Sequence, residues 1–245
     1  MFRALSSRSA KEEYMDDFAA GGEELTEALR HLRRLNRIFA ASGPMLNGVK
    51  ELWRCSGRPD QLHLMDIGAG SGEMNRRILR WADRTGIRIR ITLVDMTEEA
   101  CREADRIFQD EPRVRVVRQN VFDIGHAAAD MLICSQFLHH FPDDRLTEVV
   151  EHMLNSSKLG IVVSDIHRHW VAWSAVWLAA RLISKNRYIR HDGPLSVAKG
   201  FQSRDWERLR CSLKQQGSYQ LRYRWKPLFR YRAIIMKEDS LPEVE

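Results

Sequence analysis

The sequence predicts an α/β protein with a mostly parallel sheet covered by helices on both faces. Between residues 62 and 165, short apolar runs alternate with helical stretches, which is typical of βαβ units. Two further strands, at about 219–225 and 229–236, are joined by a connection too short for a crossover helix, so we expect this pair to be antiparallel. With 245 residues, 44% of them hydrophobic, the chain can form one sizeable core.

The elements can be placed in order along the chain. Apolar residues recur at helical spacing near the start, namely Leu25, Leu29, Leu32, Leu35 and Phe39. We expect an N-terminal helical cap over residues 1–60 and a second unit over 61–245. Strands are expected at 62–67, 89–95, 114–120, 129–135 and 158–165, with helices between most of them. A helical insertion over about 166–202 follows the fifth strand, and a helix over 203–216 precedes the final pair.

The charge balance is moderately basic, with 39 Lys and Arg against 33 Asp and Glu. Basic residues alternate with apolar ones in the last two strands, as in Arg222, Arg224, Lys226, Arg230 and Arg232. This alternation favours a solvated face of a sheet over the alternative, a surface that binds nucleic acid or an anionic membrane.

Cysteine use and apolar runs indicate a cytoplasmic protein without a membrane span. The four cysteines form no C-x-x-C pair, so neither a structural zinc site nor a disulfide framework is indicated. The N-terminus does not have the pattern of a signal peptide. The most apolar stretch, 170–183, has 14 residues including Arg181 and is too short to cross a bilayer.

A glycine-rich loop is the sharpest motif in the chain. Asp66 and Ile67 end the first strand and lead into Gly68-Ala69-Gly70-Ser71-Gly72 before a helix. Glycines at this place permit a tight turn and let a ligand approach the backbone at a helix N-terminus. Asp95 ends the next strand, where an acid that binds a ribose diol is expected.

The charges beside this loop favour S-adenosylmethionine (SAM) over a dinucleotide. Glu73 stands where the dinucleotide fingerprint has its last glycine, and Asp66 adds a second carboxylate. Two carboxylates would repel a pyrophosphate but attract an ammonium group. SAM has an ammonium group and no phosphate. A P-loop is excluded because no G-K-[ST] occurs.

The D-I-G-A-G-S-G stretch, Asp95 in L-V-D-M-T and the late hairpin resemble the Rossmann-like SAM-dependent methyltransferases over about 62–236. The resemblance implies a doubly wound, seven-stranded sheet with its last strand reversed. It also implies the cofactor contacts. Asp66, Gly68, Ala69, Gly70 and Gly72 would border the methionine part, Asp95 would bind the ribose, and Met96, Asn120, Val121 and Ser135 would complete the cofactor site. For the adenine amino group, Asn120 is the first choice and Asp123 the alternative if the register slips.

Histidines follow the fourth and fifth strands, where ligands bind in open α/β sheets. We expect His139, His140 and His167 to be the catalytic candidates, because an imidazole can act as a base near neutral pH. Helix capping or core hydrogen bonding is the alternative for His139 and His140. A metal site from Asp165, His167, His169 and His191 is conceivable, but its geometry is not fixed by the sequence, and we predict no metal.

The insertion after the fifth strand is the predicted place for acceptor specificity. Trp170, Trp173 and Trp177 share one helix face and form either part of the core or an aromatic wall for an acceptor, together with His191. The L-H-H-F stretch resembles that of small-molecule methyltransferases, including the ubiquinone and menaquinone C-methyltransferases. An N-P-P-Y element, typical of enzymes that methylate exocyclic amines of bases, is absent from this position.

A narrower resemblance concerns D-I-H-R-H, the later R-H-D-G-P-L-S-V and the N-terminal M-D-D. These stretches are similar to bacterial methyltransferases associated with type III polyketide synthase products, which implies a phenolic or pyrone-like acceptor with an alkyl tail. We therefore expect O-methylation of a small hydrophobic acceptor. The alternatives are C-methylation of such a ring, an RNA or protein substrate, and an inactive SAM-binding module. A homodimer stays open.

Overall fold

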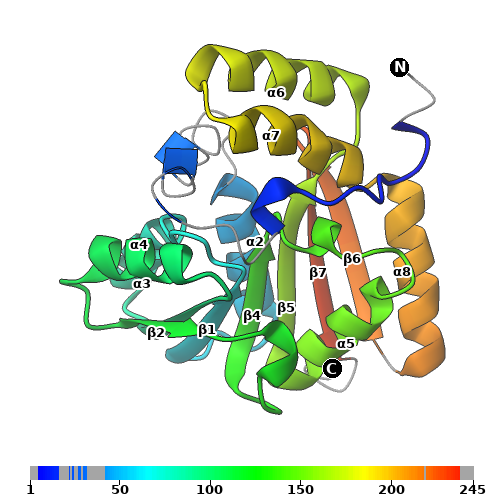
Figure 1. The fold of residues 1–245 in the computed structure, drawn as a ribbon. Coiled ribbons are helices and arrows are strands. Elements are labelled where there is room, and N and C mark those ends of the chain that lie inside the picture. The colour runs from blue at the N-terminus through cyan, green and yellow to red at the C-terminus, as the bar shows by residue number, and fades with distance from the viewer. Residues whose placement is uncertain are drawn as a thin grey trace.

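The computed structural model describes residues 5–16, 22, 24, 27, 28, 30, 31, 42–217 and 219–237. Its centre is a seven-stranded sheet with the order β3-β2-β1-β4-β5-β7-β6 (Figure 1). The strands are β1 Gln61–Ile67, β2 Arg88–Asp95, β3 Val114–Arg118, β4 Ala129–Ser135, β5 Ser157–Ile166, β6 Tyr219–Lys226 and β7 Arg230–Lys237. Strands β1 to β5 pair parallel, and β7 pairs antiparallel with both β5 and β6. The predicted doubly wound sheet with its last strand reversed is therefore confirmed.

Helices cover both faces of the sheet. The helices are α2 Ser42–Cys55, α3 Asn75–Thr85, α4 Glu98–Phe108, α5 Leu146–Ser156, α6 Trp170–Ile183, α7 Arg187–Lys199 and α8 Ser203–Gln216. One apolar core joins α2, α3 and α4 to the sheet, and a second joins α5 and α8 to its other face. Strand residues alternate between the two cores. Leu64 belongs to the first core and Met65 to the second, which explains the nearly continuous apolar runs in the sequence.

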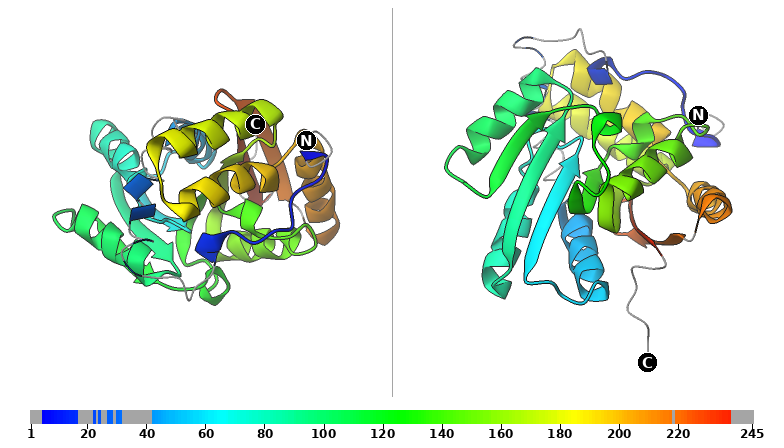
Figure 2. Two further views of the ribbon diagram at one scale, coloured as in Figure 1. Left: turned by 45° about the horizontal axis from the view of Figure 1, so that its top comes forward. Right: turned by 90° about the horizontal axis from the view of Figure 1, so that it is seen from below.

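The insertion after β5 consists of two helices. In Figure 1, α6 and α7 lie above the carboxyl ends of the parallel strands, and Figure 2 shows them side by side from above. The sequence analysis predicted α6 but left 190–201 without an assigned element. Pro194 lies inside α7, where Leu195 and Val197 are buried. Tertiary packing therefore maintains a helix that Gly193 and Pro194 would locally disfavour.

The N-terminal region differs from a continuous helical cap. Residues 5–13 form no α-helix, and a single 3-10 turn, η2, covers Tyr14–Asp16. The predicted helical positions Leu25, Leu29, Leu32, Leu35 and Phe39 lie outside the described residues, whereas 24, 27, 28, 30 and 31 are helical. α2 packs directly on β5 and β7. The division into 1–60 and 61–245 stays a prediction.

Candidate functional site

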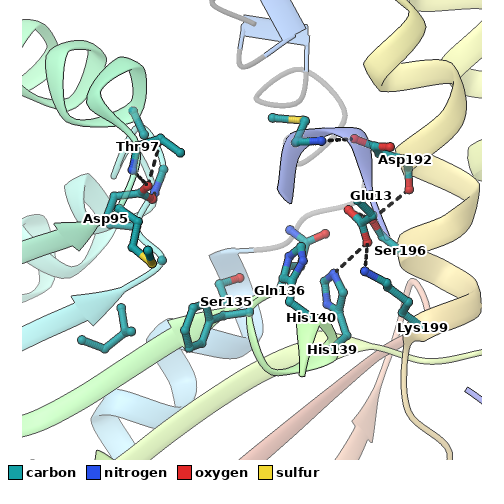
Figure 3. Close-up of a pocket in the computed structure, with 18 of the residues that line it drawn as sticks. Glu13, Asp95, Thr97, Ser135, Gln136, His139, His140, Asp192, Ser196 and Lys199 are labelled. Carbon is teal, nitrogen blue, oxygen red and sulfur yellow. Dashed lines mark hydrogen bonds and ion pairs between the residues drawn. The ribbon is translucent and has the colours of Figure 1, made fainter. Parts of the chain in front are cut away.

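A cavity of about 2250 Å³ opens at the carboxyl ends of the parallel strands. Figure 3 shows side chains converging on it from opposite sides. Its lining comes from the glycine loop, the ends of β2, β3 and β4, the segment after β4, residues 7–15 and one side of α7 along its length. All ten residues predicted to bind the cofactor line this cavity, namely Asp66, Gly68, Ala69, Gly70, Gly72, Asp95, Met96, Asn120, Val121 and Ser135.

The glycine loop has a backbone conformation that residues with a side chain rarely adopt. Gly68, Gly70 and Gly72 have φ values of 63°, 55° and 66°, in the left-handed region. A Cβ on Gly68 would lie 2.5 Å from the Phe137 ring, and one on Gly72 would lie 2.4 Å from Leu93. Nothing lies within 4 Å of a Cβ built on Gly70. The loop thus packs tightly at both ends and leaves open space beside its middle.

Asp66 is a fully buried carboxylate at the end of β1. Its Oδ2 accepts a hydrogen bond from Asn75 Nδ2 at 2.6 Å, whereas its buried Oδ1 accepts none in the described part of the structure. Burial, opposed by the Asn75 hydrogen bond and reinforced by the charge of Asp95, raises the pKa of Asp66 to about 7. A cationic group placed at this oxygen would satisfy it and favour its charged form.

Asp95 is held in place by the loop that it faces. Its Oδ2 accepts a hydrogen bond from Gly70 N at 2.8 Å, and its Oδ1 accepts from Thr97 N and Oγ1 at 3.0 and 2.9 Å. Asp95 Oδ2 keeps a further lone pair, so a ribose hydroxyl can still donate to it. Met96 is partly exposed beside it.

Asn120 rather than Asp123 faces the cavity at the end of β3. The Asn120 side chain caps the 3-10 turn η3, Val121–Asp123, because its Oδ1 accepts a hydrogen bond from Phe122 N at 3.0 Å. Asp123 is exposed and outside the lining. The register-slip alternative is therefore wrong, and one lone pair of the Asn120 amide oxygen is already engaged.

The two histidines after β4 have different surroundings, although both lie in the 3-10 turn η4, Leu138–His140. His139 is buried; its Nδ1 is 2.7 Å from Asp165 Oδ1 and its Nε2 is 3.7 Å from Glu13 Oε1. His140 is less buried and stacks on the His139 ring with centroids 4.3 Å apart. His140 is thus the histidine with more access to the cavity.

Asp165 is a fully buried acid on β5 that holds His139. Burial raises its pKa, but the charge and hydrogen bond of His139 and the hydrogen bond from Ile166 N outweigh that effect, so the pKa lies below its usual range. Asp165 also accepts a hydrogen bond from His139 N. It therefore fixes both the backbone and the ring of His139.

Residues 5–16, which we call the N-terminal strap, contribute site residues that the sequence analysis missed. Glu13 lies 3.6 Å from Lys199 Nζ and accepts a hydrogen bond from Ser196 Oγ at 3.0 Å (Figure 3). The three partners of Glu13, His139, Ser196 and Lys199, are 126, 183 and 186 positions away in the chain, so no local pattern could reveal this cluster.

Hydrogen bonds along the strap hold it over the cavity. Arg8 donates to the carbonyl oxygens of Lys199, His139 and Phe141 and to Asp143 Oδ1. Farther along, Asp192 accepts from the backbone N–H groups of Tyr14 and Met15. These two anchors position the strap as one wall of the cavity.

Two histidines predicted to face the acceptor lie outside the described lining, which corrects the sequence analysis. His167 accepts a hydrogen bond from Trp225 Nε1 at 3.1 Å, and burial followed by the charges of His169 and Arg168 lowers its pKa to about 4. The turn of the chain after β5 directs this ring towards the β6–β7 hairpin. His191 stacks on Tyr14 at 3.8 Å and bonds to Asp192, so it supports the strap.

The three tryptophans do not form an aromatic wall of the described cavity. Trp173 packs in a small core with Ile166, Val197 and Phe229, whereas Trp170 and Trp177 are exposed. α7 supplies the insertion's cavity-lining residues in place of α6. The predicted stripe is real, but it points away from the site.

The residues considered above as a metal site, Asp165, His167, His169 and His191, do not come together in the structure. Asp165 faces His139, whereas His167 faces Trp225. In the described part of the chain, one group of three potential metal ligands has its donor atoms within 4.8 Å of one another. It consists of Glu13, His139 and His140. Lys199 already places an ammonium group against Glu13, which opposes the binding of a cation there.

Comparisons with known proteins relate the fold to other structures. Residues 64–160 match a family model described as a methyltransferase domain. No curated protein sequence matches the chain. The plantazolicin methyltransferase BpumL in complex with SAH has 13% identity and a TM-score of 0.65 over 87% of this chain and 95% of that one.

Two further structures share the fold. A SAM-dependent methyltransferase from Aquifex aeolicus has 13% identity and a TM-score of 0.58, over 86% of this chain and 98% of that one. The CMeT domain of the citrinin polyketide synthase has 11% identity and a TM-score of 0.54 over 72% of this chain. The present chain spans 46% of the length of that structure. Among the helices that the structure describes, none has the length and apolar character needed to cross a membrane.

Proposed function

We propose that this chain, which has the fold of these methyltransferases and matches a methyltransferase domain model over residues 64–160, is a class I SAM-dependent methyltransferase that methylates a small hydrophobic acceptor. The supporting observation is one cavity with two unlike halves. The glycine loop and Asp95 form the half suited to SAM. Phe137, Phe141 and Tyr188 contribute apolar surface to the rest of the lining.

The proposed reaction is an in-line displacement at the cofactor methyl group by an acceptor oxygen. Holding both groups in line in a pocket that excludes water supplies most of the rate enhancement. SAM supplies the activated methyl group, which leaves the sulfonium as the oxygen–carbon bond forms. The protein's part is to bind the acceptor, orient its oxygen and accept its proton.

His140 is the proposed base, and His139 its positioning partner. His140 lines the cavity together with Phe137, which lies next to the glycine loop. His139 instead has both ring nitrogens directed at carboxylates. The phenol or enol oxygen of a polyketide- or quinone-like molecule is the favoured acceptor, because its proton is acidic enough for an imidazole to remove. The polyketide synthase and natural-product neighbours support this class of acceptor.

C-methylation of such a ring is the second candidate, because the same histidine could remove the proton from a methylated carbon. An RNA or protein acceptor receives less support, since the basic residues of the β6–β7 hairpin lie outside the described cavity lining. An inactive SAM-binding module would bind SAM without turnover on any acceptor.

The test uses methyl-labelled SAM with alkyl-substituted phenols and pyrones, followed by mass spectrometry of the products. We expect label on an oxygen of a small aromatic product. We expect His140→Gln to lower kcat by about 10²- to 10⁴-fold with SAM affinity nearly unchanged. His167→Gln is the matched control and should retain turnover. Label only in RNA or protein, or full activity in His140→Gln, would contradict the proposal.

A further inference from the structure

Helix α6 exposes a face that is almost entirely apolar. Leu178 and Leu182 are 53% and 78% exposed, and Trp170 and Trp177 on the same side are 49% and 38% exposed. Arg181 is the charged residue of the helix, and its guanidinium lies 3.8 Å from the Trp177 ring centroid. A helix on the surface of a water-soluble domain ordinarily has polar residues on its outer face.

The opposite face of α6 accounts for its packing within the molecule. Ala172 and Ala180 are buried, and Trp173 and Val176 pack with Ile166 and Val197. In Figure 1, α6 lies above α7 as the outermost helix. The outer leucines and tryptophans are therefore not needed to attach α6 to the protein, and their exposure requires another explanation.

The tip of the β6–β7 hairpin extends this apolar surface. Trp225 and Leu228 are 51% and 47% exposed. Phe229, next to Leu228, packs against α6, and the His169 ring lies between Phe229 and Trp170 at centroid distances of 5.2 and 5.9 Å. We call the combined surface the α6 face. It comprises Trp170, Trp177, Leu178, Leu182, Trp225 and Leu228.

Positive charge surrounds the α6 face. Between residues 166 and 204 the one acid is Asp192, which is buried, and residues 208–237 contain none. Arg181 is exposed on α6, Lys185 directly after it, and Arg190 on the first turn of α7. Arg222 and Arg224 are exposed on β6, towards the tip of the hairpin. These five exposed basic residues place positive charge beside the apolar surface.

We propose that the α6 face docks on the surface of an anionic phospholipid bilayer. Tryptophan and leucine would enter the boundary between headgroups and acyl chains, while arginine and lysine side chains reach the negatively charged headgroups. The helix would lie in the plane of the interface, because its 14 residues are too few to span the bilayer. This inference does not depend on the acceptor proposed above.

A second copy of the chain fits this surface less well. A twofold interface brings the same patch of both subunits together, so the basic residues around one α6 face would meet those around the other. No acids among 193–204 and 208–237 are available to pair with them. An anionic lipid surface instead supplies the opposite charge across the whole patch.

Docking would also place the site near a store of apolar molecules. α6 packs on α7, and α7 supplies Tyr188, Ile189 and Asp192 to the cavity lining. One thin helical layer thus separates the proposed membrane-facing surface from the cavity. A lipid-soluble acceptor dissolved in the bilayer would have a short path to the site.

The experiment is flotation of the full chain with vesicles of phosphatidylcholine alone or mixed with phosphatidylglycerol. We expect binding to the mixed vesicles that weakens as salt is added. Leu178→Ser with Leu182→Ser should weaken it by about tenfold or more. Arg181→Glu with Lys185→Glu should have a comparable effect, and Arg102→Glu with Arg106→Glu on α4 is the charge-matched control.

All these substitutions are on exposed side chains, and thermal melting verifies that each variant is folded. Quenching of tryptophan fluorescence by brominated acyl chains would further support insertion of the α6 face. No flotation with mixed vesicles, or equal flotation of the Leu178/Leu182 variant, would overturn the proposal. A dimer by light scattering that this variant dissociates would also overturn it, because the face would then be covered by a second copy.

Discussion

Asp66 combines a functional position with a cost to stability. Its folded-state pKa of about 7 lies above the ordinary value of 3.8, so the folded protein binds a proton that the unfolded chain releases between these values. The free energy of unfolding is therefore larger at low pH, where Asp66 is protonated, and falls as the pH rises to about 7. We predict that Asp66→Asn stabilises the protein at pH 8 by up to about 4 kcal/mol, measured by urea unfolding.

The same substitution should remove cofactor binding. An ionised Asp66 attracts the ammonium group of SAM, so binding favours loss of the Asp66 proton. We expect SAM affinity of the natural protein to rise between pH 6 and pH 8 by calorimetry, and Asp66→Asn to bind at least tenfold more weakly without this dependence. If the variant showed the same rise, another titrating group would be responsible.

At the scale of elements, the N-terminal strap is held chiefly by one side chain. The Arg8 guanidinium is 6% exposed, bonds to three carbonyl oxygens and lies 4.6 Å from the Phe201 ring centroid. We predict that Arg8→Ala releases the strap, since each buried carbonyl left unpaired costs about 1–3 kcal/mol. The acceptor KM should rise about tenfold, and proteolysis should cut the strap faster.

Ser6→Ala is the control for this prediction, because Ser6 is exposed on the same strap and lies outside the cavity lining. It should leave both the acceptor KM and the rate of proteolysis close to those of the natural protein. SAM affinity should change little in either variant, since the glycine loop and Asp95 are not bonded to Arg8. Equal acceptor KM values for Arg8→Ala and Ser6→Ala would show that the strap does not form part of the acceptor site.

Elements whose determinants are local were predictable, and those that depend on distant partners were not. The apolar run before Gly68 and the acid at Asp95 define β1, β2 and the cofactor side of the cavity within short stretches of sequence. The strap has no helical or strand periodicity. Arg8 donates a hydrogen bond to the carbonyl oxygen of Lys199, which lies 191 positions later in the chain. α7 could not be placed from the sequence because Gly193 and Pro194 locally disfavour a helix, whereas burial of their neighbours outweighs that local preference.

The same distinction applies to site residues at the scale of the whole molecule. Trp170, Trp173 and Trp177 recur at helical spacing on α6, but Trp173 packs inward whereas Trp170 and Trp177 are exposed. Sequence periodicity cannot say whether a side chain faces the cavity, a core or solvent. His167 and His139 both follow strands at the same sheet edge, yet the hairpin covers the first and the strap the second. The choice between them depends on topology that no short motif contains.

At the scale of the whole molecule, the packing of α2 predicts where the folding unit begins. Met45, Val49 and Leu52 on α2 are completely buried against the sheet, and a Cβ on Gly48 would lie 2.4 Å from Val162. Because α2 contacts β5 and β7 and shares their core, we expect it to belong to the same folding unit as the sheet. We predict that a chain starting at residue 42 unfolds cooperatively by circular dichroism.

A chain starting at residue 61 should fail to fold, because loss of α2 uncovers the sheet and removes three buried side chains that contribute about 1.5–3 kcal/mol each. The chain from 42 should still bind SAM, since the glycine loop, Asp95 and Asn120 are retained. It should lose acceptor turnover, since Glu13 and the rest of the strap are absent. Cooperative folding of the chain from 61 would instead place the boundary at residue 60 and make α2 part of the N-terminal cap.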